Sequence, residues 1–366
     1  MIKQKFSDIF DDVTKNGKKI PANQYQEYGK YQIIDQGQNA TAGYTDCVDG
    51  LFTDIPAIVF GDHTRVIKYI DKPCFLGADG VKLLKTKDRF ANYKYLYYAL
   101  LNVKIPDTGY NRHFKWLKES CIPMYDISVQ NDIVNHFDKI FYLINARKEQ
   151  LLKLDELVKS RFVEMFGDQK SNQYGLPIAI LGDVCTFYSG TGFPNGYQGH
   201  ISGKYPFYKV RDISRNVQNG NKFLKDCDNY IDRDVVDKLK GSVLPKGTVV
   251  FAKIGEALRL NRRAITSQDC LIDNNAMGIR PGNNLDLEYF YSYMLQLDMG
   301  KYAGTTAIPS VRKSTLENVP IIVPDLPKQK QFADFAEHVD KSKFEIKQSL
   351  EKLELLKRAL MQKYFG

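Results

Sequence analysis

The sequence lacks the features of a secreted, membrane-spanning or metal-binding chain. Its six cysteines include no Cys-x-x-Cys pair, and none stands beside a metal-spaced histidine, which indicates free thiols rather than a disulfide framework or a zinc site. No run of about 18 apolar residues occurs, and the N-terminal residues contain no apolar signal core. These absences predict a cytoplasmic protein without a membrane span.

Catalytic motifs are absent as well. The nearest run to a phosphate-binding Gly-x-x-x-x-Gly-Lys-Ser/Thr loop, residues 199–205, has the wrong spacing and lacks the Ser or Thr after the lysine. The sequence contains no Gly-x-Gly-x-x-Gly, no His-Glu-x-x-His and no Asx-Pro-Pro-aromatic motif of amino-methyltransferases. Five scattered histidines do not indicate a nucleophilic triad, and the adjacent Asp62 and His63 fit a contact or turn element better than an acid–base pair. The sequence therefore predicts a chain without an active site.

Positive charge is present in excess. The 366 residues have a formal net charge of +9, and a hydrophobic content of 43% is sufficient for folded cores. This length suits about two or three domains. A net positive charge favours a polyanionic partner such as nucleic acid, and the alternative is a basic soluble protein without such a partner.

A long internal repeat is the most informative feature. Residues 117–167 align without gaps to residues 316–366, at a constant offset of 199 residues. Both copies contain an Asp-x-x-x-Gln entry and a terminal Phe-Gly, with a charged amphipathic segment between them. Chance similarity between two charged helices explains the shared Leu and Lys positions but not the shared entry and exit. We therefore interpret the two segments as a duplication.

Each copy predicts an extended lead-in followed by a long helix. The proline-containing runs 121–124 and 319–324 suit extended backbone, and the helices are expected to begin at about Asn131 and Lys330. Each helix is expected to be about 35 residues long. Apolar residues follow a heptad seam, Ile133, Phe137, Ile140, Ile144, Leu151, Leu154, Val158, Phe162 and Met165 in the first copy and Phe332, Ala336, Val339, Ile346, Leu350, Leu353, Leu360 and Tyr364 in the second.

The seams leave two arrangements open. One is a coiled-coil dimerisation handle, and the other is packing of the two copies on each other within one chain. Arg147 aligns with Ile346 and Ile144 aligns with Lys343, so neither copy is a complete strip for self-association. We favour antiparallel pairing within the chain, because the chain must return to place a domain at each end.

The repeat divides the chain into four parts. We expect target-binding domains at 1–115 and 169–315 and helical segments at 116–168 and 316–366. Both globular parts have short β-type runs, such as 57–61 and 248–251, and both close with a helical aromatic run, 93–101 matching 287–295. We expect the aromatic side chains to be core residues. The predicted fold class is α+β, with two mixed α/β domains joined by two long helices packed as an antiparallel coiled coil.

Basic loops supply the candidate DNA contacts. Arg can read guanine and Asn can read adenine in the major groove, whereas Lys and His suit phosphates, and a solvated surface charge is the alternative for any single residue. The candidates in the first domain are Asp62, His63, Thr64, Arg65, Lys68, Tyr110, Asn111, Arg112 and His113. Those in the second domain are Lys209, Arg211, Lys253, Arg259, Arg262, Arg263 and Arg312.

At this point the whole chain resembles the specificity subunit of type I restriction–modification systems. The resemblance rests on the repeated lead-in and helix, on Pro324–Gln329, and on the final Phe365-Gly366. The runs 61–69, 77–80, 109–114 and 181–184, with Gly190 and Pro194, look like parts of recognition domains. The first copy departs from the pattern, because it has Tyr125 and Ser128 where the second has Pro324 and Pro327.

The resemblance implies a division of labour among subunits. Each recognition domain would read one half of a bipartite, asymmetric site in double-stranded DNA, and the helices would set the gap and dock two modification subunits. No cofactor is expected in this chain. The modification subunits would bind S-adenosylmethionine and methylate adenine, and restriction subunits, with motor and nuclease activity, would use ATP and Mg²⁺. The rival interpretations are a structural coiled-coil DNA-binding protein without strong specificity and a nuclease or methyltransferase in its own right.

Overall fold

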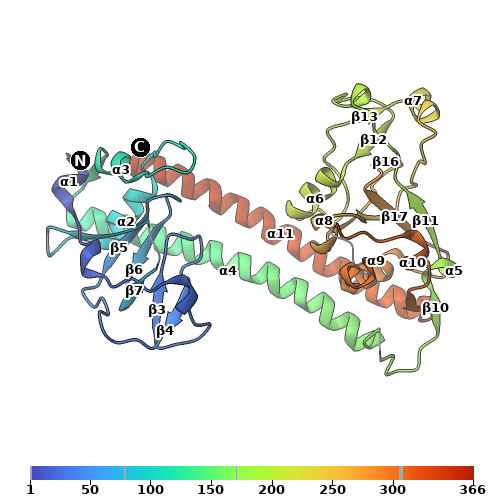
Figure 1. Cartoon of the computed structure of the whole chain (residues 1–366), viewed down its shortest axis with the longest axis horizontal. Coiled ribbons are helices and arrows are strands. Elements are labelled where there is room, and N and C mark those ends of the chain that lie inside the picture. Colours follow the sequence, from blue (N-terminus) through green and yellow to red (C-terminus); the bar gives the residue numbers. More distant parts are fainter. Residues whose placement is uncertain (1, 78–79, 170, 305–307) are drawn as a thin grey trace. The chain divides into compact units, whose positions relative to one another are not determined.

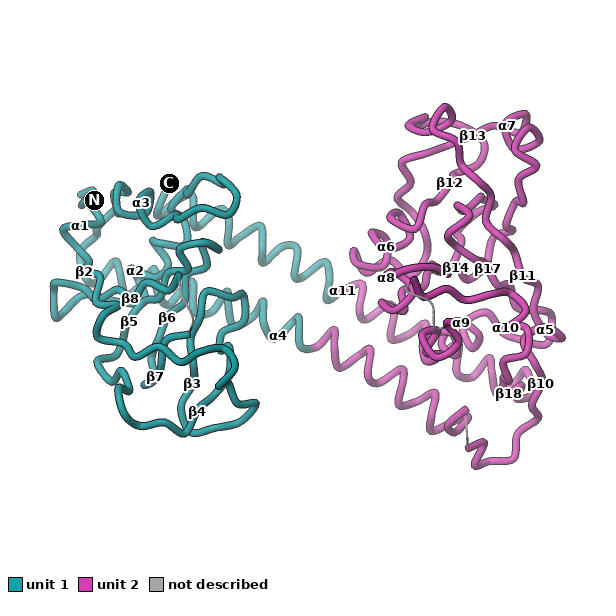
Figure 2. The backbone as a smooth tube through the Cα atoms, in the orientation of Figure 1, with its two compact units in different colours: residues 1–149, 346–366 teal, residues 150–345 magenta. Residues whose placement is uncertain are grey.

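The computed structural model describes residues 2–77, 80–169, 171–304 and 308–366. Ala78 and Asp79, in the 77–80 motif, lie outside the described residues. The chain forms two compact units (Figure 2): unit 1 contains residues 1–149 and 346–366, and unit 2 contains residues 150–345. Each unit therefore includes one globular part together with part of each long helix. The domain boundaries at 115 and 315 stay predictions.

In unit 1, short strands form three small sheets (Figure 1). One antiparallel sheet has the order β2-β8-β5-β6, a mixed sheet has the order β4-β3-β7, and β1 pairs antiparallel with β9. The elements are β1 (Ile2–Lys5), α1 (Phe6–Ile9), β2 (Phe10–Asp12), β3 (Tyr31–Ile34), β4 (Gly43–Thr45), β5 (Ala57–Gly61), β6 (Ile67–Ile70), β7 (Cys74–Leu76), β8 (Val81–Thr86), α2 (Tyr93–Leu101), α3 (Phe114–Lys118) and β9 (Cys121–Met124), with short 3₁₀ turns at Thr14–Asn16 and Ala22–Gln24.

Unit 2 repeats this arrangement with different loops. Its sheets have the orders β11-β17-β14-β15, β13-β12-β16 and β10-β18. The elements are β10 (Ile178–Ile180), α5 (Leu181–Val184), β11 (Cys185–Ser189), β12 (Tyr205–Tyr208), α6 (Val210–Gln218), β13 (Tyr230–Ile231), α7 (Arg233–Lys238), β14 (Val249–Ala252), α8 (Glu256–Arg259), β15 (Arg263–Ile265), β16 (Leu271–Ile272), β17 (Ala276–Pro281), α9 (Leu287–Gln296), α10 (Lys313–Glu317) and β18 (Pro320–Ile322), with 3₁₀ turns at Asn195–Tyr197 and Met299–Tyr302.

The duplication extends beyond the helices that revealed it. In both units an opening strand pairs antiparallel with the lead-in of a long helix, β1 with β9 and β10 with β18. A one-turn helix follows in each, and its first backbone N–H donates to the residue before the lead-in, Phe6 to Ser120 at 2.9 Å and Leu181 to Val319 at 2.9 Å. The two globular parts are therefore versions of one fold.

The long helices are α4 (Ile127–Phe166) and α11 (Leu326–Phe365), each of 40 residues. They begin about one turn before the predicted starts at Asn131 and Lys330, because Ser128 and Pro327 are tolerated in a first turn, where backbone N–H groups need no intrahelical partner. Their first and last residues are offset by the same 199 residues as the sequence repeat. The gapless alignment thus corresponds to two helices of equal length.

The helices pack antiparallel, as shown separately in each unit. In unit 1, Phe137 near the start of α4 stacks on Phe365 at the end of α11, with ring centroids 5.8 Å apart. In unit 2, Phe162 near the end of α4 packs edge-on against Phe332 at the start of α11, at 5.4 Å. The predicted pairing within one chain is confirmed.

The predicted seam faces inward along its full length. Its members near the ends of the helices, such as Ile133, Phe137, Phe162 and Phe332, are buried, whereas Leu151, Leu154, Ile346 and Leu350 are half-buried. At the ends a globular part covers the seam, but two helices alone cannot exclude water from its middle.

The aromatic runs before the lead-ins are core residues, as predicted. Tyr95 on α2 and Tyr289 on α9 are fully buried, and each hydroxyl donates to a lead-in carbonyl, Tyr95 to Pro123 and Tyr289 to Ile322 at 2.5 Å. Each helix begins with a side-chain cap, Asn92 in unit 1 and Asp286 in unit 2. The capped helix and its buried tyrosine fix each globular part on its lead-in.

Candidate nucleic-acid interface

In unit 1 the structure brings together two predicted loops that lie about 50 residues apart in the sequence. Asp62, at the end of β5, is buried and is the link between them. Its carboxylate accepts from the Phe114 backbone N–H at 2.8 Å, and its carbonyl accepts from the His113 backbone N–H at 2.7 Å. Loops 61–65 and 109–113 therefore form one surface.

The side chains of this surface differ in exposure. His113 is 1% exposed, and its Nδ1 lies 3.0 Å from the Asp62 carbonyl. Tyr110, in contrast, is 86% exposed and stacks on the His63 ring, with centroids 4.6 Å apart and planes 8° apart. Asp62 and His113 thus have internal contacts that hold the loops. Tyr110 presents an aromatic face to solvent.

Two of the basic candidates in unit 1, Arg65 and Lys68, contact carboxylates. Arg65, which has a positive φ of 62°, donates to Asp107 at 2.8 Å, and this pair together with the Gly109 backbone N–H keeps the pKa of Asp107 below its usual range. Lys68 is buried beside Asp35 at 3.3 Å, and its burial lowers the pKa of the ammonium despite that partner. Arg112 and Asn111 are exposed.

Gln36 is a functional candidate that the sequence did not reveal. Its side-chain oxygen accepts from the His63 backbone N–H at 3.1 Å, and its carbonyl accepts from the Thr64 hydroxyl at 2.6 Å. Gln36 thus holds the loop that carries His63 and Arg65. No local pattern connects it with positions 63 and 64, because the link depends on the pairing of β3 with the rest of the domain.

Unit 2 has an equivalent pair of loops. Lys253, just after β14, accepts at its carbonyl from the Val311 backbone N–H at 2.9 Å, which places Arg312 beside the 253–263 segment. Arg312 and Arg259 are exposed, and Arg259 forms an ion pair with Glu256 at 3.5 Å. Arg262 is half-buried.

Arg263 differs from the other candidates because it is 1% exposed. Its guanidinium donates to the carbonyls of Asn261 and Leu297 at 2.5 and 2.7 Å. Burial lowers the pKa of Arg263 to about 10, so the side chain stays charged at neutral pH. These contacts tie β15 to the end of α9 and account for Arg263 without any ligand. Its role as a DNA contact stays a prediction.

Lys209 and Arg211 line a polar pocket of about 280 Å³ in unit 2. Arg215 forms a two-pronged ion pair with Asp228 at 2.8 and 2.9 Å, and Arg211, which is 81% exposed at its side chain, adds a third contact at 3.0 Å. These guanidinium groups hold the pKa of Asp228 below its usual range. The Lys209 ammonium donates to Gln198. Arg211 is therefore ordered by Asp228 while its side chain remains accessible.

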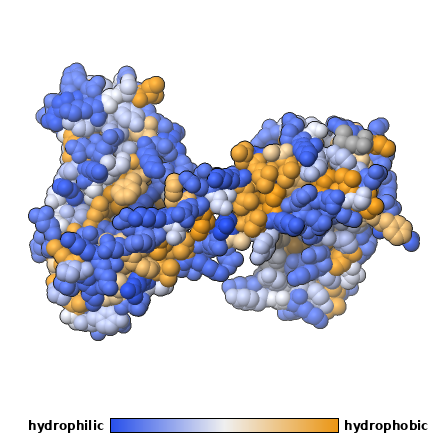
Figure 3. Space-filling view, turned by 180° about the vertical axis from the view of Figure 1, so that it is seen from behind, coloured by the Kyte–Doolittle hydropathy of each residue, from blue (hydrophilic) through white to orange (hydrophobic). Residues whose placement is uncertain are grey.

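Most side chains on the face drawn in Figure 3 are hydrophilic, and apolar groups gather in patches. Within the described residues, no group of three or more His, Cys, Asp or Glu side chains is placed to hold a metal ion. Among the same residues, no helix is both long and apolar enough to cross a membrane. The candidate site consists of exposed arginine and aromatic side chains and half-buried lysines, on loops and short helices that hydrogen bonds hold in place.

Comparisons with known proteins agree with this geometry. Residues 179–357 match the type I restriction modification DNA specificity domain family. The fold is similar to that of a type I restriction–modification S subunit from M. genitalium, at 17% identity, covering 100% of this chain and 96% of that one, with a TM-score of 0.61. It is also similar to a chain from a structural study of complex assembly and conformational transition in the type I system, at 14% identity, covering 99% and 95%, with a TM-score of 0.55.

Proposed function

We propose that the chain is a DNA specificity subunit of a type I restriction–modification system, and that each of its two recognition domains reads one half of a bipartite, asymmetric DNA site. One observation carries this proposal. The two units have the same sheet orders and the same lead-in contacts, but their exposed loops carry different side chains. A shared scaffold with divergent loops suits two readers of different sequences.

The loop chemistry supports a two-step recognition. Exposed Lys and Arg side chains first attract the phosphate backbone without regard to sequence and in a salt-dependent way. Arg112 in unit 1 and Arg259 and Arg312 in unit 2 are exposed and can then test base edges in the major groove. Because both readers belong to one chain, binding of the first raises the effective concentration of the second.

The partners follow from the family. We propose that the chain supplies specificity and no chemistry, and that two modification subunits dock on α4 and α11. Those subunits would bind S-adenosylmethionine and methylate adenine, and restriction subunits would use ATP and Mg²⁺. A target base must leave the helical stack before it can be methylated, so the modification subunits would act on a flipped adenine.

Selection from a randomised duplex library tests the recognition step. Purified full-length chain is expected to enrich two short sequence blocks separated by a constant, unspecified gap. Enrichment of a single block would contradict two readers, and no enrichment above random duplex would favour a coiled-coil DNA-binding protein without specificity.

A second assay tests the proposed absence of chemistry. The chain is incubated with S-adenosylmethionine, Mg²⁺ and a DNA library. No methyl transfer and no cleavage are expected. Transfer by chain purified free of any modification subunit would identify it as a methyltransferase.

A further inference from the structure

Lys222 occupies an unusual place in unit 2, because it connects three elements. Its backbone carbonyl accepts from the Ile265 N–H at 2.8 Å, which anchors it beside β15 in the central sheet. Its ammonium donates to Asp340 on α11 at 2.8 Å and to Glu288 on α9. The ammonium also lies 5.5 Å from the centroid of the Tyr291 ring.

The three charged side chains are largely withdrawn from water. The exposed fractions are 20% for Lys222, 19% for Glu288 and 38% for Asp340. Burial disfavours the charged ammonium, but the two carboxylates outweigh this effect and raise the pKa of Lys222. Removing the lysine would leave the Glu288 carboxylate without this cation, whereas Asp340 would keep its ion pair with Lys343 at 3.7 Å. Leaving a largely buried carboxylate without its cation is more costly than losing an exposed ion pair.

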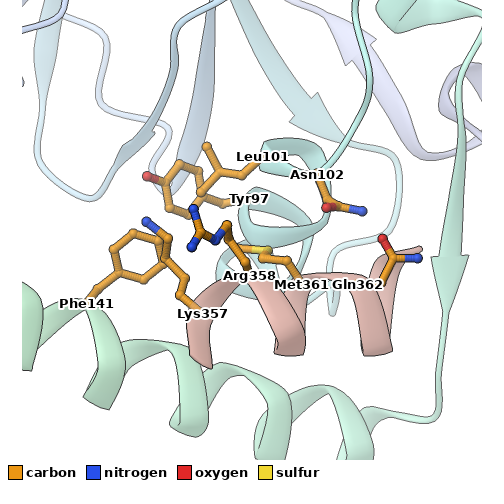
Figure 4. A pocket seen from close by; sticks show the side chains of 8 residues that line it. All are labelled: Tyr97, Leu101, Asn102, Phe141, Lys357, Arg358, Met361 and Gln362. Carbon is orange, nitrogen blue, oxygen red and sulfur yellow. The ribbon is translucent and has the colours of Figure 1, made fainter. Parts of the chain in front are cut away.

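Unit 1 has an open pocket where unit 2 has this lysine. The aromatic runs 93–101 and 287–295 are offset by 194 residues (287 − 93 = 194), so Tyr291 corresponds to Tyr97. The long helices are offset by 199 residues, so Asp340 corresponds to Phe141. Tyr97 and Phe141 line a pocket of about 580 Å³ with Lys357 and Met361 (Figure 4). In unit 1, α2 contacts α4 through an ion pair between Lys94 and Asp138, at 2.6 Å. The lysine that reaches from the sheet to the long helix is thus a specific addition in unit 2.

We propose that Lys222 is a positioning residue that fixes the angle of the second recognition domain on α11, and thereby the gap at which the second half-site is read. The inference rests on the proposed function. Without this contact, the domain is held on α11 by apolar packing and by the hydrogen bonds of Gln329 at the first turn of the helix. A second polar contact at Asp340, further along the helix, restricts the angle of the domain more than these contacts do by themselves. A looser domain can reach half-sites at neighbouring gaps while its reading loops are unchanged.

The test compares three variants with wild type in the library selection. K222M removes the contact and leaves both carboxylates, whereas K222M/E288Q/D340N removes the contact and both carboxylate charges together. K222R keeps the positive charge. K238M is the matched control, since Lys238 on α7 forms an exposed ion pair with Asp234 in the same domain. Unfolding midpoints are measured on the same samples.

We expect K222M and the triple variant to enrich the wild-type half-sites with a broader gap distribution. The preference for the native gap over gaps one base pair longer or shorter should fall about tenfold, or about 1.4 kcal/mol. The triple variant should melt closer to wild type than K222M does, because it has no Glu288 carboxylate left without its cation, and yet its gap distribution should stay broad. K222R and K238M should keep the wild-type gap.

Other outcomes overturn the inference in distinguishable ways. An unchanged gap in a folded K222M or triple variant would show that Lys222 does not position the domain. A triple variant that regained both stability and the native gap would show that K222M acted only through stability. Loss of the second half-site at every gap, in folded protein, would indicate a direct DNA contact. If wild type itself enriched no bipartite site, the proposed function would fail first and this inference with it.

Discussion

Gln130 and Gln329, which lie 199 residues apart, make the same hydrogen bond. Each donates its side-chain amide to the backbone carbonyl five residues earlier, Gln130 to Tyr125 at 2.8 Å and Gln329 to Pro324 at 2.7 Å. Both side chains are buried. The repeated Asp-x-x-x-Gln entry in the sequence thus has a structural purpose, because the glutamine closes the turn between the lead-in strand and the first turn of the long helix.

Replacing these glutamines by alanine should destabilise the fold unequally. Q130A leaves one carbonyl without its donor, for a loss of about 1–3 kcal/mol in the free energy of unfolding. Gln329 also donates to Asn284 at 3.0 Å and accepts from the Asp286 N–H at 2.8 Å, so Q329A should cost more than Q130A. Urea denaturation monitored by circular dichroism measures both. Q218A, at an exposed helix end, is the control, and equal effects of all three changes would contradict the assignment.

The candidate arginines of the two units should act on separate half-sites. R65A or R112A should relax or abolish recognition of the first half-site, and R259A or R262A that of the second, each by about 1–3 kcal/mol of discrimination. Competition binding against DNA with one half-site randomised separates the two. R233A, on α7 in an exposed pair with Asp237, is the control. Uniform weakening on every sequence would identify phosphate contacts instead of base readers.

Unit 2 should lose stability in acid when Asp228 is protonated and its ion pairs are lost. Arg215 and Arg211 hold the pKa of this carboxyl below the ordinary value of 3.8, so its ion pairs stabilise the fold above that value and are lost as pH falls through the lowered pKa. At neutral pH, D228N should lose about 1 kcal/mol or less, because the carboxyl is partly exposed to solvent. Denaturation curves of D228N and wild type should converge in strong acid, and a difference that grew as pH fell would contradict the sign.

The long helices should set the gap between half-sites. Lys148 lies 4.0 Å from Glu354 in unit 1 and Asp155 lies 2.6 Å from Lys343 in unit 2, so position 149 on α4 is opposite the region of position 350 on α11. Insertion of seven residues after Glu149 and another seven after Leu350 keeps the seam in register on both helices.

This matched insertion should lengthen the preferred gap by about three base pairs, because seven helical residues add about 10 Å and each base pair rises about 3.4 Å. The half-site sequences should be unchanged. The single insertion after Glu149 is the control, since it leaves one helix short and should weaken binding without defining a new gap. A protein with both insertions that bound well at the original gap would show that the helices do not set the gap between half-sites.

Much of this architecture was readable from the sequence because it is repetitive. The heptad seam and the constant offset predicted two antiparallel helices, and the structure confirms them from both ends. The aromatic runs at 93–101 and 287–295 predicted helices with core side chains, as Tyr95 and Tyr289 show. Local periodicity and residue type carry this information, since a long apolar stripe has to be covered by an equally long partner.

Other features required the folded chain. The pairing of β1 with β9, and of β10 with β18, joins segments more than 100 residues apart, and no local pattern specifies such a partner. The helices begin one turn earlier than predicted. A proline is tolerated there because a backbone N–H in the first turn has no intrahelical partner.

The sequence alone indicated the family resemblance, the duplication and the basic residues that are candidates for contact with a polyanion, because each of these depends on composition or on a repeating pattern. Only the tertiary structure decided what each candidate side chain is available to do. It buried Arg263 against Asn261 and Leu297, left Tyr110 exposed on His63, and placed Lys222 between a sheet and two helices. The physical reason is that exposure and partnership depend on which distant segments meet, and that choice is made by packing of the whole domain.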